Sequence, residues 1–126
     1  MDDKEPGRRT GILDLERRRY PRFKINLPLD YYRLGKQATQ NAKARDISEG
    51  GLNVYFPEAL EIGEQVRLKL FFATPESDLE SIEATAEVTW VAILSGDGEY
   101  QSGVKLVDIS SEDLTKLKNF LATLAI

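Results

Sequence analysis

Short extended segments separated by turn residues make up most of this chain after position 22, and this pattern constrains the fold more than any other feature. Residues 66–72 are the clearest case, because apolar and charged residues alternate there as in a strand with one buried face. Asp97-Gly98 is a strong hairpin signal, and Pro57 ends another extended segment. Strands are therefore predicted over residues 27–33, 39–46, 52–56, 66–72, 82–94 and 100–107. In the fifth of these, alternation places Trp90 on the same side as Val88, with the expected core residues.

The hydrophobic period changes to that of a helix near residue 110. Ser110 and Asp113 have the spacing of a capping box, and Leu114, Leu117 and Leu121 recur at helical intervals. Such a stripe must pack on the sheet. Six antiparallel strands followed by one helix predict a mainly β fold, namely a small closed six-stranded β-barrel with a C-terminal α-helix. Residues 1–15 are expected to form a flexible N-terminal arm, and residues 16–126 the folded domain.

The residue types that are missing narrow the class of protein. The 126 residues include no Cys and no His, so thiolate chemistry and the usual general base near neutral pH are both absent. We therefore expect no enzyme activity, no metal site and no cofactor. There is no apolar run of about 18 residues and the N-terminus is polar and acidic, which predicts no membrane span, no signal peptide and a cytoplasmic protein.

Charge is distributed unevenly along the chain. Residues 1–24 contain eight Lys or Arg against five Asp or Glu, whereas the remainder contains nine against sixteen, within an overall net charge of −4. A basic arm on an acidic body is suited to capturing a small anion where the two meet. The acidic body fits nucleic-acid binding poorly, because phosphate contacts need a broad basic face, and no nucleic-acid partner is expected.

Most of the basic residues of the arm lie in one cluster, Arg17-Arg18-Arg19-Tyr20-Pro21-Arg22. A guanidinium binds phosphate as a two-pronged donor and stacks on flat rings, which an ammonium does not. Taken alone, three adjacent arginines near a terminus are usually a solvated charge run. Arg18 and Arg22, however, lie four positions apart on either side of Tyr20 and Pro21, and in an extended arm they could approach one ligand from two sides.

The second motif is Asp46-x-Ser48-x-x-Gly51, which predicts a tight turn between two strands. Asp and Ser before glycine form such turns in many loops without any function. Asp108-Ile109-Ser110 repeats its first three residues where Ser110 is expected to cap the helix. Beside the arginines, the turn offers short acceptors and a close backbone approach. Together the two motifs indicate a site for a small, flat, doubly anionic ligand, which is the description of a nucleotide.

The two motifs together resemble the two-part signature of PilZ domains, which are bacterial receptors for cyclic diguanylate (c-di-GMP). The resemblance extends over about residues 16–124 and includes Phe23, the Leu27-Pro28 pair, the strand with Trp90, and the strand around Gly103. It implies a PilZ-like barrel and a bacterial second-messenger receptor. All five signature positions are present, namely Arg18, Arg22, Asp46, Ser48 and Gly51.

The resemblance also implies a role for each signature residue. Arg18 and Arg22 would bind phosphates and the O6/N7 edge of guanine, an edge that arginine also recognises in DNA. Asp46 and Ser48 would bind the guanine from the rim of the barrel, and Gly51 would let the chain turn so that they face it. A basic residue at Arg17 implies that the ligand is held as an intercalated dimer. The role of Arg19 stays open.

The function predicted from the sequence is thus c-di-GMP binding that orders the N-terminal arm over the barrel and signals to a separate protein effector. Two alternatives remain at this point. One is an adaptor of the same fold that binds proteins but no nucleotide. The other is a small oligonucleotide-binding barrel, which the acidic body disfavours.

Overall fold

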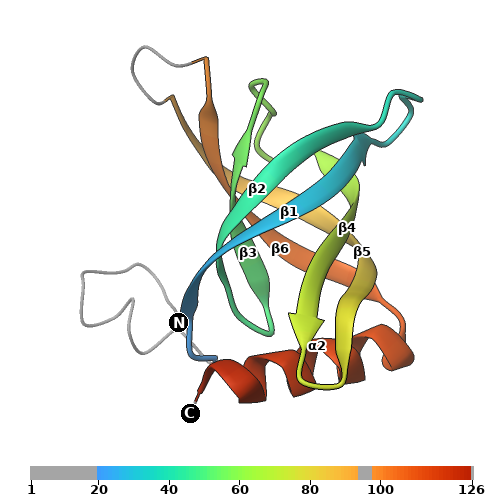
Figure 1. Ribbon diagram of the computed structural model, residues 1–126. Coiled ribbons are helices and arrows are strands. Elements are labelled where there is room, and N and C mark those ends of the chain that lie inside the picture. Colours follow the sequence, from blue (N-terminus) through green and yellow to red (C-terminus); the bar gives the residue numbers. More distant parts are fainter. Residues whose placement is uncertain (1–19, 94–97, 126) are drawn as a thin grey trace, which may run out of the picture.

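The computed structural model describes residues 20–93 and 98–125 and shows a mainly β protein (Figure 1). Its strands are β1 (Phe23–Arg33), β2 (Gln40–Ile47), β3 (Gly51–Phe56), β4 (Gln65–Thr74), β5 (Ser77–Ile93) and β6 (Tyr100–Ile109). All strand pairs are antiparallel, and the order β1-β2-β3-β6-β5-β4 closes into a barrel through the pairing of β1 with β4. Helix α2 (Ser111–Leu124) follows. The fold class predicted from the sequence is confirmed, whereas the predicted arm over residues 1–15 lies outside the described residues.

The core fills the barrel because the strands largely alternate in burial, most regularly in β4. In β4, Val66, Leu68 and Leu70 are each at most 1% exposed, while the charged residues between them face outward. Helix α2 lies across one end of the barrel, at the bottom of Figure 1, and buries Leu117, Phe120 and Leu121. The Phe120 ring packs against Phe72, with centroids 4.5 Å apart.

The start of α2 has the cap that its sequence predicts. The Ser110 hydroxyl accepts a hydrogen bond from the Asp113 backbone N–H at 3.1 Å. The Asp113 carboxylate accepts a further bond from the backbone N–H of Glu83 in β5, which ties the first turn of the helix to the barrel wall. Within the described residues, no helix is long and apolar enough to cross a membrane.

Beta-bulges in β2 and β5 change which side chains face outward. In β2 the pairing with β3 shifts between Ala44 and Asp46, so that Arg45 and Asp46 both face outward between the buried Ala44 and Ile47. In β5 the pairing with β6 shifts between Val88 and Trp90. Trp90 is consequently 40% exposed on the outer surface, and its predicted place on the core side with Val88 is wrong.

Strand β1 divides its pairing between two neighbours. It pairs with β2 along most of its length, but with β4 only from Leu29 to Arg33. Pro28, which has no N–H to donate, lies just before the pairing with β4 begins, as expected for a proline at an unpaired strand edge.

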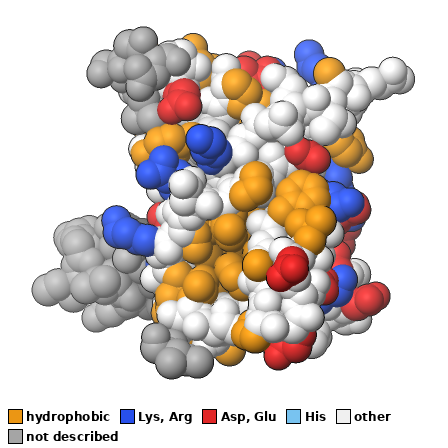
Figure 2. Space-filling view, viewed as in Figure 1, with side chains coloured by type: hydrophobic (Ala, Val, Ile, Leu, Met, Phe, Trp, Pro, Cys, Tyr) orange, Lys and Arg blue, Asp and Glu red, His pale blue; other side chains and the backbone are white. Residues whose placement is uncertain are grey.

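The face of the molecule seen in Figure 2, which has the same orientation as Figure 1, carries hydrophobic side chains near its middle and charged groups around them.

Where β1 ends, a polar network ties three segments together. Glu58 accepts hydrogen bonds from Tyr31 Oη at 2.7 Å and Gln40 Nε2 at 2.6 Å, and Arg33 Nη1 donates to it at 3.1 Å. Arg33 also donates to both oxygens of Glu64, from Nη2 at 2.9 Å and from Nε. Burial, together with the bond to Glu58, raises the pKa of the Tyr31 phenol, while the hydrogen bonds from Arg33 lower the pKa of Glu64. The network holds the connection between β3 and β4 against β1.

Candidate ligand-binding site

The site forms around an ion pair between the two sequence motifs. Arg22 lies one residue before β1, and its Nη1 is 2.6 Å from Asp46 Oδ1. Both side chains keep contact with solvent, at 39% and 25% exposure. The pair exists because antiparallel pairing sets Lys24 opposite Asp46, which brings the residue before β1 to the bulge of β2. The structure thus joins two signature positions that are 24 residues apart in the sequence.

The second oxygen of Asp46 has a different partner. Asn53 lies directly opposite Asp46 in the β2–β3 pairing, and its Nδ2 donates to Asp46 Oδ2 at 3.3 Å. The amide oxygen of Asn53 accepts in turn from Gln101 Nε2 at 3.2 Å, across the β3–β6 pairing. Neither amide belongs to the sequence signature. Asp46 is therefore held on one side by Arg22 and on the other by a pair of amides.

Ser48 lies in the turn that joins β2 to β3. It is 5% exposed; its backbone N–H donates to Gly51 O at 2.9 Å, and its hydroxyl accepts from Gly50 N at 3.2 Å. Glu49 in the same turn lies 3.9 Å from Lys118 Nζ, which links the turn to α2. In this arrangement the Ser48 hydroxyl shapes the turn that carries the motif.

The structure indicates a reason for glycine at position 51 other than the turn that the sequence predicted. Among the described glycines only Gly35, Gly63 and Gly98 have positive φ, so Gly51 is not required by the turn conformation. A Cβ atom at Gly51 would instead lie 2.3 Å from the backbone oxygen of Val104 in β6. The glycine therefore allows β3 to approach β6 at the point where their pairing begins.

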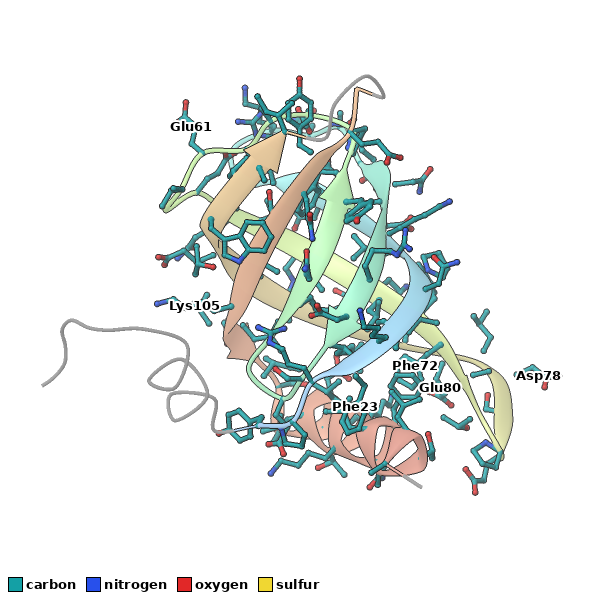
Figure 3. All side chains as sticks on the ribbon, turned by 90° about the vertical axis from the view of Figure 1, so that its left-hand side faces the viewer. Phe23, Glu61, Phe72, Asp78, Glu80 and Lys105 are labelled. Atoms are coloured by element: carbon teal, nitrogen blue, oxygen red, sulfur yellow. The ribbon has the colours of Figure 1, made fainter. Side chains whose placement is uncertain are left out.

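A cavity of about 170 Å³ opens beside the ion pair on the outer face of β3, β5 and β6, the face turned toward the viewer in Figure 3. Its lining residues are Arg22, Asp46, Leu52, Asn53, Trp90 and Gly103. A guanidinium, a carboxylate, an amide and an indole thus surround one space. Trp90 and Asn53 were not predicted as site residues, because only the register of the strands brings them to Asp46.

Not every predicted site residue can be placed. Arg17, Arg18 and Arg19 lie outside the described residues, and so does their expected contact with a ligand. The described chain begins at Tyr20, whose ring lies beside Gly50: a Cβ atom there would be 3.4 Å from Tyr20 Cδ2. The segment preceding Arg22 therefore enters next to the turn that carries Ser48 and Gly51.

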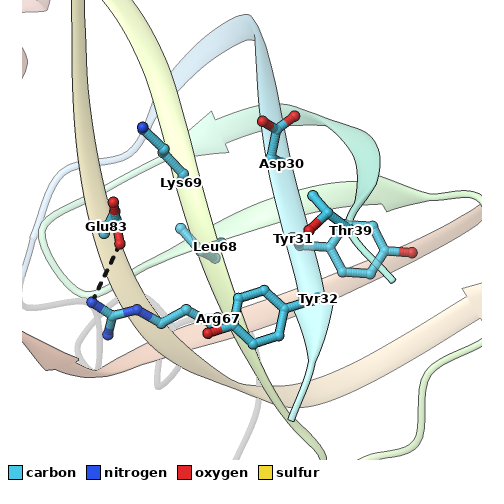
Figure 4. Close-up of a pocket in the computed structure, with 8 residues that line it drawn as sticks. All are labelled: Asp30, Tyr31, Tyr32, Thr39, Arg67, Leu68, Lys69 and Glu83. Atoms are coloured by element: carbon cyan, nitrogen blue, oxygen red, sulfur yellow. Dashed lines mark ion pairs between the residues drawn. The ribbon is translucent and has the colours of Figure 1, made fainter. Parts of the chain in front are cut away.

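A second cavity of about 200 Å³ lies on the outer surface of β1 and β4 (Figure 4). It is lined by charged and aromatic groups, including Tyr32, Arg67, Lys69 and Glu83. Arg67 Nη2 is 3.7 Å from Glu83 Oε1, and Arg67 Nη1 donates to Thr85 at 3.1 Å. Arg67 thus already binds two residues of β5, the strand next to its own. No group of three or more acidic side chains in the described part of the chain could hold a metal ion.

Comparison with known proteins identifies the family. A family model described as "PilZ domain" matches residues 16–123. The chain belongs to the PilZ domain family. The resemblance inferred from Arg18, Arg22, Asp46, Ser48 and Gly51 is confirmed at the level of the family. No curated protein matches the chain at a significant level.

Three solved structures share this fold. The PilZ domain with c-di-GMP of YcgR from Escherichia coli is 15% identical, with a TM-score of 0.66 over 86% of this chain and 92% of that one. The inhibitor of motility MotI/DgrA from Bacillus subtilis is 22% identical, with a TM-score of 0.68 over 82% and 48%. The MrkH–c-di-GMP complex of K. pneumonia is 19% identical, with a TM-score of 0.65 over 86% and 52%. The chain spans about half the length of MotI/DgrA and MrkH.

Proposed function

We propose that this PilZ domain is a receptor for c-di-GMP and not an enzyme. The observation that carries the proposal is the Arg22–Asp46 pair at the edge of a cavity that Trp90 also lines. A guanidinium supplies donors for phosphate or for the acceptor edge of guanine, a carboxylate accepts from guanine N–H groups, and an indole offers a flat surface. The ligands in the YcgR and MrkH structures support the same choice of nucleotide.

Binding would add contacts to the ligand while Arg22 keeps one bond to Asp46. Arg22 would turn one side of its fork to a phosphate or to guanine O6 and N7, while Asp46 accepts from guanine N1–H and the amino group. A hydrogen bond to a charged group contributes about 1.5–3 kcal/mol, so two or three of them are enough to offset weakening a partly exposed pair. Ser48 and Gly51 would hold Asp46 in place through the turn.

The arginines before Tyr20 complete the proposal. Arg18 would take the second set of phosphate contacts and Arg17 those of a second, intercalated ligand molecule, as the resemblance to the family implies. Because Tyr20 enters beside Gly50, a ligand bound at Arg22 and Asp46 lies next to the point where this segment joins the barrel. Ligand binding would then order the segment over the barrel and present an altered surface to a protein effector.

Calorimetric titration of the purified protein tests the proposal. We expect c-di-GMP to bind with submicromolar affinity, cyclic di-AMP to bind at least tenfold more weakly, and a short RNA not to bind. Arg22→Ala and Asp46→Ala should each weaken c-di-GMP binding by at least tenfold, which corresponds to about 1.4 kcal/mol. Arg67→Ala, which removes an arginine from the other cavity, is the matched control and should bind as the parent does. A folded parent protein that gives no binding heat with c-di-GMP would exclude the receptor function.

A further inference from the structure

We propose that Asn53 and Gln101 are positioning residues that hold the Asp46 carboxylate in the orientation that selects guanine. The inference rests on the proposed function and deepens it, because it assigns a role in ligand selection to two residues outside the signature. Its basis is a continuous chain of hydrogen bonds on the outer face of β2, β3 and β6, running from Gln101 through Asn53 to Asp46. Arg22 closes the other end of the chain at 2.6 Å.

The strand register produces this chain. Asn53 lies opposite Asp46 on β2 and opposite Gly103 on β6. Gly103 has no side chain to offer Asn53 a hydrogen bond, and the amide of Asn53 bonds to the diagonal neighbour, Gln101. Gln101 is itself paired with Tyr55, two positions along β3. Diagonal pairs on a sheet surface lie within reach of long polar side chains.

The direction of each hydrogen bond is the important feature. A carboxylate is only an acceptor, so Asn53 must present its NH2 group, not its oxygen, to Asp46. Gln101 enforces this choice, because its own NH2 group donates to Asn53 Oδ1 and turns that oxygen away from Asp46. If the Asn53 amide were reversed, its oxygen would face the carboxylate and repel it. Gln101 therefore controls the orientation of Asp46 although it does not contact it.

In this arrangement the Asp46 carboxylate can still accept hydrogen bonds from guanine. Each carboxylate oxygen can accept about two hydrogen bonds, and each already has one partner, Arg22 on Oδ1 and Asn53 on Oδ2. Both oxygens thus keep acceptor capacity, in a plane set by their two partners. Guanine offers two adjacent donors, N1–H and the 2-amino group, whereas the equivalent edge of adenine has an acceptor at N1. A fixed carboxylate therefore discriminates between the two bases, and a rotating one does so less well.

The substitution Gln101→Glu tests the inference with almost no change in shape. The carboxylate that it introduces would repel Asn53 Oδ1 and attract the NH2 group of the same amide, which reverses the Asn53 amide. We expect c-di-GMP affinity to fall about tenfold and the preference over cyclic di-AMP to fall by a similar factor. Gln101→Leu, which removes the donor without adding charge, should give a smaller loss in the same direction. Gln37→Glu, at an exposed residue in the β1–β2 connection, is the matched control for the added charge and should leave both quantities unchanged.

A second readout separates this inference from the proposed function. In the protein without nucleotide, Gln101→Glu should shift the side-chain amide resonances of Asn53 and the guanidinium resonance of Arg22 in NMR spectra, whereas Gln37→Glu should not. These shifts test the chain of hydrogen bonds even if the parent protein fails to bind c-di-GMP. Unchanged Asn53 and Arg22 resonances, or an unchanged ratio of affinities in a parent that binds, would overturn the proposal. Thermal unfolding of each variant shows whether the fold is retained.

Discussion

Trp90 covers Gly103 so closely that a Cβ atom on the glycine would lie 2.0 Å from the indole Nε1. Two features of the structure create this contact. The bulge in β5 turns Trp90 outward, and the Thr89 hydroxyl donates to the Gly103 carbonyl at 3.1 Å next to it. The contact places the indole at the cavity beside Arg22 and Asp46. A glycine on one strand thus leaves the room in which an aromatic side chain of the neighbouring strand lies.

Substituting Gly103 by Ala should displace Trp90 from the cavity wall. Overpacking of this kind costs about 1–3 kcal/mol, and the displaced indole becomes more exposed. We expect a lower melting temperature and a red shift of the tryptophan emission. This emission reports Trp90 alone, because the chain has one Trp. Combining Gly103→Ala with Trp90→Ala removes the clash, so adding the alanine at 103 should cost much less in that background. Equal costs in both backgrounds would contradict the contact.

The two adjacent glycines of the signature turn should respond differently to alanine. Gly51→Ala places a methyl group 2.3 Å from a backbone oxygen of β6 and must separate β3 from β6. In Gly50→Ala the new methyl group meets the Tyr20 ring at 3.4 Å and Ser48 Oγ at 3.9 Å, both ordinary contact distances. We expect Gly51→Ala to destabilise the fold by about 2 kcal/mol or more, and Gly50→Ala by less than about 1 kcal/mol. Chemical denaturation measures both values, and equal effects would exclude the close approach as the reason for Gly51.

Acid should weaken the polar network at the end of β1 through Glu64. Hydrogen bonds from Arg33 lower the pKa of Glu64 in the folded protein, so its carboxylate stabilises the fold above the ordinary carboxyl pKa of about 4.3. That contribution should be lost as the pH falls below this value toward the lowered pKa. Glu64→Gln should reduce stability by about 1–2 kcal/mol at pH 7 and much less at pH 3. Urea unfolding at both pH values measures it, and an equal difference at the two would contradict the assignment.

Replacing Arg22 by Lys tests whether the fork of the guanidinium is needed. A lysine keeps the charge and can still pair with Asp46, but it cannot donate two parallel bonds to guanine or phosphate. We expect c-di-GMP affinity to fall about tenfold or more while the melting temperature changes little, because the pair is partly exposed. Arg67→Lys in the other cavity should leave binding unaltered. Full affinity in Arg22→Lys would show that Arg22 acts only as a point charge.

Much of this architecture was accessible from the sequence, because the signals concerned are local. Alternation in residues 66–72 predicted β4, the Ser110–Asp113 spacing predicted the cap of α2, and the strand boundaries differ mainly in length. The motif residues Arg22 and Asp46 were also identified, and the structure brings them into contact. The predicted contacts of Arg17 and Arg18 stay predictions.

The sequence by itself determined the set of strands, the closing helix and the chemical types at the site, since each depends on neighbouring residues or on a motif. Only the tertiary structure decided how these groups meet. One extra residue in β5 turned Trp90 from the expected core to the outer face, and the register of β2, β3 and β6 joined Asn53 and Gln101 to Asp46. Gly51 lies so close to β6 that a Cβ atom would be 2.3 Å from Val104 O, and its φ is not positive. The physical reason is the same in each case: register and bulges depend on hydrogen bonds between strands distant in sequence, and a shift of one residue exchanges the two faces of a strand.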